Sequence, residues 1–475
     1  MTSRLAPGSH VHFVAICGVG MASLAGLLQS QGYRITGSDQ NVYPPMSTFL
    51  AGLGIELSSG YSEENIRGRP DLVVIGNVVS RNNPEAQAVM ERGIPYLSLP
   101  QALSQFLIGA KRSIVVAGTH GKTTTASLMA WILSQAGWDP SFFIGGIPVN
   151  FQSGFGSGQG EWVVMEGDEY DSAFFDKGPK FLHYKPEKLI LTSLEFDHAD
   201  IYRDLEHLKE SFRRLIELVP ASGILIVSSE YPAIKEICQR TRAPVLYYGT
   251  PRADWEARNF RILGQRSLFD VFHRGNFDGA LGISLMGRHN VTNALAVYAM
   301  GRELGIERAI LQGALATFAG VRRRQEIKGS VGGITVIDDF AHHPTAVRET
   351  VAAVRGAYAG RRLWAIFEPR SHTSRRKIFA SEFAQTLAAA DLVVVAGLYQ
   401  PEKVPVQDQL VPEEVVAEIN RFSGNGRAVY LQKTPDIVAH VDQEARAGDV
   451  ILVMSNGGFD GVQDKILQQL RARYS

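Results

Sequence analysis

The feature that most constrains the fold is a glycine turn with a Lys-Thr pair, placed between an apolar run and a helix-compatible segment. The run at 114–117 is rich in β-branched residues, which is typical of a buried strand. The segment 126–135 favours a helix, and Gly137 then ends it. The turn between them reads Gly118-Thr119-His120-Gly121-Lys122-Thr123-Thr124. In this order, backbone N–H groups and a helix N-terminus form a phosphate-binding loop, the P-loop.

The residue types in this P-loop match the chemistry of a nucleoside triphosphate. Lys122 is predicted to reach the β- and γ-phosphates, and the Thr123 hydroxyl to contact Mg²⁺. The general P-loop pattern has a glycine five positions before Gly121, where Val116 stands here. The loop is therefore a shorter variant, and a solvated Gly/Thr turn before a helix is the alternative interpretation.

The composition allows a large enzyme and gives no sign of a nucleic-acid or membrane partner. A chain of 475 residues with 45% hydrophobic and 20% charged residues is expected to form about three domains. Lys and Arg together number 48, as do Asp and Glu, so nothing favours a nucleic acid or a membrane surface as partner. Two cysteines indicate a reducing compartment, and Met1–Gly8 lacks an apolar signal segment. We expect a cytoplasmic enzyme.

The first part of the chain alternates strand and helix patterns, which predicts a parallel sheet with crossover helices. A strand at 12–16 precedes Gly18 and Gly20, and a second strand at 33–36 is followed by Asp39. Glycines before a helix and an acid after the second strand are similar to a dinucleotide-binding fingerprint, although the third glycine is missing. Glycines needed only for tight helix–strand packing are the alternative.

The rest of the chain predicts two further α/β units. The central one contains the P-loop and ends in alternating apolar and polar residues at 256–286, which indicate an antiparallel meander at a sheet edge. The Gly/Ser-rich stretch 153–160 is expected to be a flexible loop. The third unit alternates strands and helices as an open α/β sheet. The predicted domains are 1–109, 110–325 and 326–475, and the fold class is α/β.

Acidic residues follow two predicted strands of the central unit. Glu166 begins the run Glu-Gly-Asp-Glu-Tyr-Asp, and residues 195–200 read Glu-Phe-Asp-His-Ala-Asp. The carboxyl ends of parallel strands meet at one sheet edge, so both runs are expected beside the P-loop, where they can supply oxygen and imidazole ligands to a metal. Solvated loops are the alternative for each run.

The third unit has a comparable cluster at a strand end. Residues 338–344 read Asp-Asp-Phe-Ala-His-His-Pro, with Pro344 suited to the first turn of a helix. Paired acids can hold a ribose or a metal, and the histidines can orient a substrate or cap the helix. The basic residues at 322–324 suit either phosphate binding or a solvated linker.

Together these motifs resemble the Mur ligases, which build the peptide of the peptidoglycan precursor on a UDP-sugar. The resemblance spans nearly the whole chain in family order. Its motifs are the P-loop, Glu166, Asp197-His198, Gly287-Arg288-His289-Asn290-Val291-Thr292-Asn293, Arg323-Arg324-Gln325-Glu326 and Asp338-Asp339-Phe340-Ala341-His342-His343-Pro344. The resemblance implies a three-domain architecture: a Rossmann-like N-terminal domain, a P-loop ATPase-like central domain and a Rossmann-like C-terminal domain.

Two members of the family share the His-His-Pro signature. One adds L-alanine to UDP-N-acetylmuramate, and the other, a peptidoglycan-recycling ligase, adds the tripeptide L-alanyl-γ-D-glutamyl-meso-diaminopimelate. The runs at 169–177, 194–201, 368–371 and 454–459 look like the second member. Three sites depart from its pattern: Gly178-Pro179, Ser193 and Asp460. Ser193 puts a hydrogen bond near the metal site in question, and the other two could alter peptide preference.

The resemblance also implies a reaction and a set of site residues. ATP would phosphorylate the muramate carboxylate, and the amine would attack the acyl phosphate and release phosphate, with ADP as the other product. The implied ligands of ATP are the P-loop residues with Asn290, Asn293, Arg324 and Asp339. Those of Mg²⁺ are Thr123, Glu166 and His198, and Lys122, Glu166 and His198 form the catalytic set. Gly18, Gly20 and Asp39 would bind the UDP-sugar, and Arg370, His372, Ser455 and Asn456 the peptide.

Three other functions remain open from the sequence. The alanine-adding ligase differs only in its amine substrate. An NAD-linked oxidoreductase would use the first domain but leave the P-loop and both acidic runs unexplained. A non-catalytic regulator would bind ATP without releasing phosphate. The third residue of the peptide, diaminopimelate or lysine, and the oligomeric state are also open.

Overall fold

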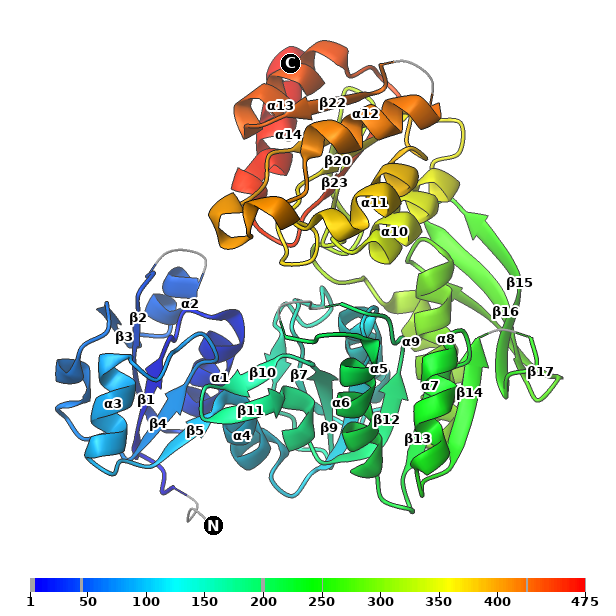
Figure 1. The fold of residues 1–475 in the computed structure, drawn as a ribbon. Helices are drawn as coiled ribbons and strands as arrows, with labels where there is room; N and C mark the ends of the chain where they lie inside the picture. Colours follow the sequence, from blue (N-terminus) through cyan, green and yellow to red (C-terminus); the bar gives the residue numbers. More distant parts are fainter. Residues whose placement is uncertain (1–4, 43–45, 198–200, 250, 424–425, 475) are drawn as a thin grey trace.

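Three large β-sheets follow one another along the chain, each with its own helices, and a two-stranded sheet accompanies them (Figure 1). The computed structural model describes all residues except 1–4, 43–45, 198–200, 250, 424–425 and 475. The sheets separate between Ile108 and Arg112 and again between Thr317 and Glu326. No helix in the described residues combines the length and the apolar character needed to cross a membrane.

The N-terminal sheet has five strands in the order β3-β2-β1-β4-β5, and every neighbouring pair is parallel. Parallel neighbours need crossover connections, which the helices between the strands provide. The elements are β1 (His10–Val14), α1 (Val19–Ser30), β2 (Arg34–Asp39), α2 (Met46–Gly52), β3 (Glu56–Ser59), β4 (Leu72–Ile75), α3 (Pro84–Glu91), β5 (Tyr96–Ser98) and α4 (Leu99–Leu103). The parallel sheet predicted for this part of the chain is confirmed.

The central sheet has ten strands in the order β17-β16-β15-β14-β13-β12-β6-β9-β7-β8. Its elements are β6 (Arg112–Ala117), α5 (Lys122–Gln135), β7 (Ser141–Phe143), β8 (Phe155–Gly156), β9 (Trp162–Gly167), β12 (Pro186–Leu191), α6 (Leu205–Glu217), β13 (Ile224–Ser228), α7 (Pro232–Ile237), β14 (Val245–Gly249), β15 (Trp255–Leu263), β16 (Arg266–His273), β17 (Asn276–Ile283), α8 (Arg288–Glu303) and α9 (Arg308–Thr317). The antiparallel β15-β16-β17 meander lies at the edge of the sheet, which confirms the prediction from the alternating pattern.

Two local features of the central domain differ from the sequence-based expectations. The stretch 153–160 is not a free loop: β8 lies within it and pairs with β7, and the Lys111 ammonium donates to the carbonyls of Gly158 and Gly160. Its glycines allow close packing of the backbone, whereas the composition alone suggested a flexible loop. Residues of the acidic run also continue into a separate hairpin of β10 (Asp171–Ala173) and β11 (Asp176–Pro179).

The C-terminal sheet has six strands in the order β18-β19-β23-β20-β21-β22, and β18 alone runs antiparallel to its neighbour. Its elements are β18 (Glu326–Val331), β19 (Ile334–Asp339), α10 (Pro344–Ala357), β20 (Leu363–Phe367), α11 (Ala380–Leu387), β21 (Leu392–Ala396), α12 (Pro412–Ser423), β22 (Ala428–Leu431), α13 (Thr434–Glu444), β23 (Val450–Met454) and α14 (Val462–Tyr474). The carboxyl ends of β19, β20 and β23 are therefore neighbours, and the site is built at this edge.

Candidate active site

The P-loop connects β6 to α5 and requires glycine at two positions. Gly118 and Gly121 have φ values of +135° and +80°, which are unfavourable for other residues. A Cβ on Gly118 would also lie 2.8 Å from the backbone nitrogen of Ser193, and one on Gly121 would lie 2.6 Å from Oδ1 of Asn293. The loop thus packs against the end of β12 and against α8, and Lys122 begins α5.

Lys122 is held by its own loop and by one acid of the first acidic run. Its ammonium donates to the carbonyls of Gly118 and Thr119 at 2.6 and 3.2 Å and lies 2.9 Å from Oε2 of Glu169. Burial lowers the pKa of Lys122, but the carboxylates of Glu169 and Asp168 outweigh this and raise it above its ordinary value. Lys122 is therefore a fixed positive charge beneath the loop. Glu169, which is 1% exposed, is a site residue that the sequence did not single out.

The two side chains predicted to hold a metal lie together next to this lysine. The Thr123 hydroxyl donates to Oε1 of Glu166 at 2.7 Å, and Oε2 of the same carboxylate accepts the Gly145 N–H at 2.6 Å. A hydroxyl and a carboxylate oxygen are hard ligands of the kind that Mg²⁺ prefers. The third predicted ligand, His198, lies outside the described residues.

The predicted nucleotide contacts from α8 and from Arg324, which precedes the C-terminal sheet, converge on the same loop. Asn293 lies against Gly121 and donates to Oδ1 of Asn290 at 3.5 Å. Arg324 donates to the Thr123 hydroxyl at 3.3 Å, and burial lowers the pKa of its guanidinium while Asp339 opposes that change. These contacts bring α8 and the connection that leads into the C-terminal sheet to the P-loop.

Asp339 has a structural task at this junction. Its carboxylate accepts the backbone N–H groups of Gln325 and Ala341 at 2.8 and 2.7 Å, which fixes the connection into the domain and the turn after β19. Burial raises the pKa of Asp339, although Arg324 and these two N–H groups act against it. The acid thereby places Arg324 where it meets Thr123.

A second contact between the domains involves two histidines and an acid. The rings of His120 and His343 lie 4.8 Å apart, and Nε2 of His120 is 3.0 Å from Oε2 of Glu195. His343 caps α10 by accepting the Thr345 N–H at Nδ1, which assigns the proton of the neutral ring to Nε2. Burial and then the charge of His120 lower the pKa of His343 to about 4. His343 therefore presents a neutral N–H donor.

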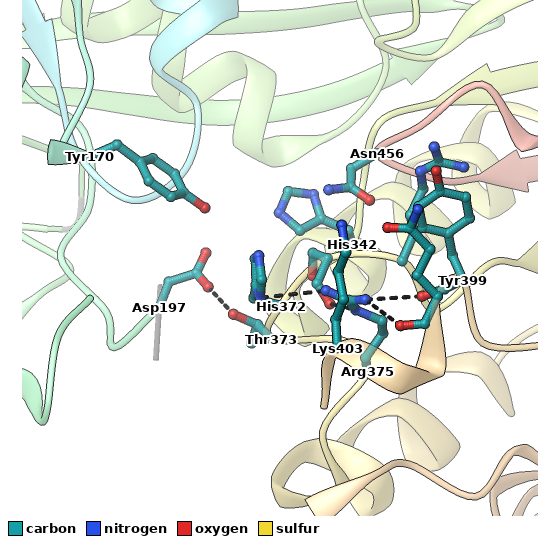
Figure 2. A pocket seen from close by; sticks show the side chains of 12 residues that line it. Tyr170, Asp197, His342, His372, Thr373, Arg375, Tyr399, Lys403 and Asn456 are labelled. Atoms are coloured by element: carbon teal, nitrogen blue, oxygen red, sulfur yellow. Dashed lines mark hydrogen bonds between the residues drawn. The ribbon is translucent and has the colours of Figure 1, made fainter. Parts of the chain in front are cut away.

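A cavity of about 230 Å³ lies between the central and C-terminal domains (Figure 2). Tyr170 and Asp197 come from the central domain, and Thr373 of the opposite wall donates to Oδ1 of Asp197 at 2.6 Å. The other lining residues come from the C-terminal domain: His342, Arg370, Ser371, His372, Arg375, Tyr399, Gln400, Lys403 and Asn456. The lining is rich in cations on the C-terminal side.

Three of the four residues predicted to bind peptide line this cavity, namely Arg370, His372 and Asn456. The structure does not bring Ser455 there. Ser455 is fully buried, and its hydroxyl donates to Oε2 of Glu368 at 2.5 Å. Sequence reasoning missed Tyr399 and Lys403, which lie in a segment without any recognisable motif.

The residues predicted for a UDP-sugar lie at the carboxyl edge of the N-terminal sheet. Gly18 is the N-cap of α1, and no side chain caps that helix, so its first N–H groups stay available to an anion. A Cβ on Gly20 would lie 3.1 Å from Leu99. Asp39 accepts the N–H groups of Cys17 and Asn41, both at 2.9 Å. Asp39 thus shapes the turn that follows β1.

Three family models together match most of the chain. Residues 10–111 match the model described as the Mur ligase family catalytic domain, 116–301 the Mur ligase middle domain, and 323–457 the Mur ligase glutamate ligase domain. The chain belongs to the Mur ligase family. The family is ATP-dependent, and this Mur ligase is an enzyme that forms a carbon–nitrogen bond, as the motifs predict.

Similar proteins carry the names of both members considered above. This Mur ligase is 42% identical to the Escherichia coli UDP-N-acetylmuramate–L-alanyl-gamma-D-glutamyl-meso-2,6-diaminoheptandioate ligase, over 97% of this chain and 98% of that protein. It is 35% identical to a UDP-N-acetylmuramate–L-alanine ligase of Pelotomaculum thermopropionicum, over 97% and 98%. A crystal structure of a murein peptide ligase from Psychrobacter arcticus has 36% identity and a TM-score of 0.72, covering 98% of this chain and 99% of that one.

Proposed function

We propose that this Mur ligase joins UDP-N-acetylmuramate to the tripeptide L-alanyl-γ-D-glutamyl-meso-diaminopimelate, using ATP and releasing ADP and phosphate. The observation that carries the proposal is the cavity between the central and C-terminal domains, whose C-terminal wall presents the cations of Arg370 and Lys403 to a ligand. The tripeptide has three free carboxylates, whereas alanine has one. The 42% identity to a ligase named for this tripeptide supports the same choice.

In the proposed reaction the muramate carboxylate first becomes an acyl phosphate, because a free carboxylate is a poor acyl donor. Lys122 and the N–H groups of the P-loop would hold the phosphates of ATP. Charge spreads over the oxygens of the transferring phosphoryl group, so the half-buried cations Lys122 and Arg324 would stabilise it electrostatically. Asn290 and Asn293 would contact the nucleotide from α8.

The amine of the tripeptide then attacks the acyl carbon, and phosphate leaves. Water would compete with the amine, so the reaction needs the C-terminal domain to cover the site. The contact of Thr373 with Asp197 supports such closure, because it joins the two domains at the cavity. Asp339 of the C-terminal sheet also accepts the N–H of Gln325, next to the Arg324 that meets Thr123.

We propose Mg²⁺ as the accompanying metal. Thr123 and Glu166 would hold it, since their oxygens lie 2.7 Å apart beside Lys122. When bound, the ion neutralises phosphate charge. By family resemblance His198 would bind a second ion.

The domain roles follow from these assignments. We propose that residues 1–109 bind the UDP-sugar, with Gly18 and Gly20 at its pyrophosphate and Asp39 near the uridine end. Residues 110–325 would bind ATP, and residues 326–475 would bind the peptide and close on the nucleotide. Because ATP and UDP-sugars are cytoplasmic, we also propose that the enzyme works in the cytoplasm.

The test is a competition experiment read by mass spectrometry. The protein is incubated with ATP, Mg²⁺, UDP-N-acetylmuramate and equal concentrations of L-alanine and the tripeptide. We expect UDP-N-acetylmuramoyl-tripeptide as the main product. UDP-N-acetylmuramoyl-alanine as the main product would show instead the alanine-adding ligase, and nucleotide binding without any product would indicate a regulator.

A further inference from the structure

Three cationic side chains line the cavity, and they differ in how far other described residues already engage them: Arg370, Arg375 and Lys403. Arg375 is occupied: it is 3% exposed, and its guanidinium donates to the carbonyls of Tyr399 and Gln400 at 3.0 and 2.9 Å. These bonds fix the segment that leads to Lys403, which ends a short helical turn at Pro401–Lys403. Arg375 thus positions this segment and has little capacity left for a ligand.

Arg370 is partly occupied. Its guanidinium lies 3.5 Å from the centre of the Tyr399 ring and 3.6 Å from Oε1 of Glu368. Half-buried and packed on an aromatic face, it offers one edge of its fork to a carboxylate deep in the cavity.

Lys403 differs from both arginines. It is exposed, and among the described residues its ammonium has no hydrogen bond or ion pair. Figure 2 shows it among the side chains that line the cavity. Its charge is therefore available to a ligand at the outer, solvent-facing part of the site.

The direction of the bound peptide follows from the position of the P-loop. Tyr170 follows Glu169, which pairs with Lys122, so the central-domain side of the cavity adjoins the phosphates. The reacting amine has to lie on that covered side, because water must be excluded from the acyl phosphate. The third residue of the peptide then extends outward to the most exposed part of the lining.

We infer that Lys403 determines which third residue the enzyme accepts, by pairing with a carboxylate at the far end of its side chain. Diaminopimelate ends in a carbon that carries both an ammonium and a carboxylate, and lysine ends in the ammonium alone. An ammonium at Lys403 attracts the extra carboxylate and gains nothing from lysine. This inference rests on the proposed function and answers a question that the sequence left open.

The test compares two tripeptides that differ only in having meso-diaminopimelate or L-lysine as third residue. For the parent protein we expect kcat/KM to be higher with diaminopimelate. Lys403→Met should lower kcat/KM for the diaminopimelate peptide about three- to five-fold, the size of one ion pair at an exposed site, and change that for the lysine peptide by less than about two-fold. Lys403→Glu should lower the ratio of kcat/KM for the diaminopimelate peptide to kcat/KM for the lysine peptide further, because its carboxylate repels the carboxylate of diaminopimelate and attracts the ammonium of lysine.

Lys377→Met is the matched control, because Lys377 is an exposed lysine of the same domain outside the cavity lining. It should leave both values unchanged. If Lys403→Met lowers kcat/KM equally for both peptides, or for neither, the inference is overturned while the proposed function stands. A parent protein that ligates L-alanine and neither tripeptide overturns the proposed function and the inference with it.

Discussion

Gly457→Ala is expected to damage peptide use while leaving the fold intact. An added Cβ at this position would overlap Nε and Cζ of Arg370, whereas one at Gly458 would have no atom within 4 Å. The obstructing atoms belong to a flexible side chain, so the guanidinium can leave its place on Tyr399 without movement of the backbone. The substitution therefore displaces the Arg370 side chain while Arg370 itself is unchanged.

The expected magnitude separates stability from catalysis. Loss of the cation–π contact between Arg370 and Tyr399 costs about 0.5–1 kcal/mol of folding free energy at a partly exposed site. Loss of a charge-assisted contact with a peptide carboxylate costs about 1.5–3 kcal/mol, which lowers kcat/KM for the tripeptide by about 10- to 150-fold. The KM for ATP should not change, because the P-loop contacts do not involve Arg370.

The assay is ADP release with the tripeptide varied at saturating ATP and UDP-N-acetylmuramate, together with a thermal unfolding curve. Gly458→Ala is the control: it lies in the same loop, and its φ of −70° is acceptable for alanine. If Gly457→Ala and Gly458→Ala give the same kcat/KM for the tripeptide, the placement of Arg370 does not contribute to peptide binding and the reasoning is refuted.

Three further predictions concern the P-loop and the domain junction. Lys122→Ala should abolish product formation. It should also lower the free energy of unfolding by about 3 kcal/mol, because the buried carboxylate of Glu169 loses its cation. The double variant Lys122→Met with Glu169→Gln should regain stability in denaturant titrations but should not regain ligation. Thr373→Val should remove the bond to Asp197 at a cost of about 1–3 kcal/mol and give a larger radius of gyration by X-ray scattering; an unchanged radius would contradict its role in closure. The pKa of His343 is lowered to about 4 in the folded protein. Between about pH 6.5 and pH 4 the unfolded chain therefore binds a proton on this ring and the folded protein does not, so the free energy of unfolding falls as the pH drops through this range. His343→Gln should therefore lessen the loss of unfolding free energy between pH 7.5 and pH 5 by about 2 kcal/mol, and an unchanged pH dependence would show that the ring is not neutral.

The sheets could be predicted because their signals are local. Apolar runs that alternate with helix-compatible segments predicted the parallel N-terminal sheet, and period-two alternation predicted the β15-β16-β17 meander. The ends of strands were less well predicted. The expected strand at 12–16 is β1 (His10–Val14), because Ala15 takes a φ of +68° that ends the strand although the apolar run continues through Ile16.

The P-loop and its acids were predictable for the same reason, since Lys122, Thr123 and Glu166 lie in motifs tied to strand ends. The partner of Lys122 was not. Glu169 is one of several acids in its run, and only the turn after β9 brings it rather than Asp168 within 2.9 Å of the ammonium. Local sequence gives the composition of such a run but not which carboxylate faces inward.

The cavity depends on contacts that no local pattern contains. Its walls come from two domains, and the contact of Thr373 with Asp197 joins those domains at the cavity. A ligand that touches both walls necessarily stabilises the joined arrangement, so peptide binding and domain closure share one equilibrium. Substitutions at Thr373 and Arg370 should consequently affect kcat/KM in a non-additive way, although the two side chains serve different contacts. The resemblance could therefore indicate Arg370, His372 and Asn456, but only the arrangement of the central and C-terminal domains shows that they line one cavity with Asp197.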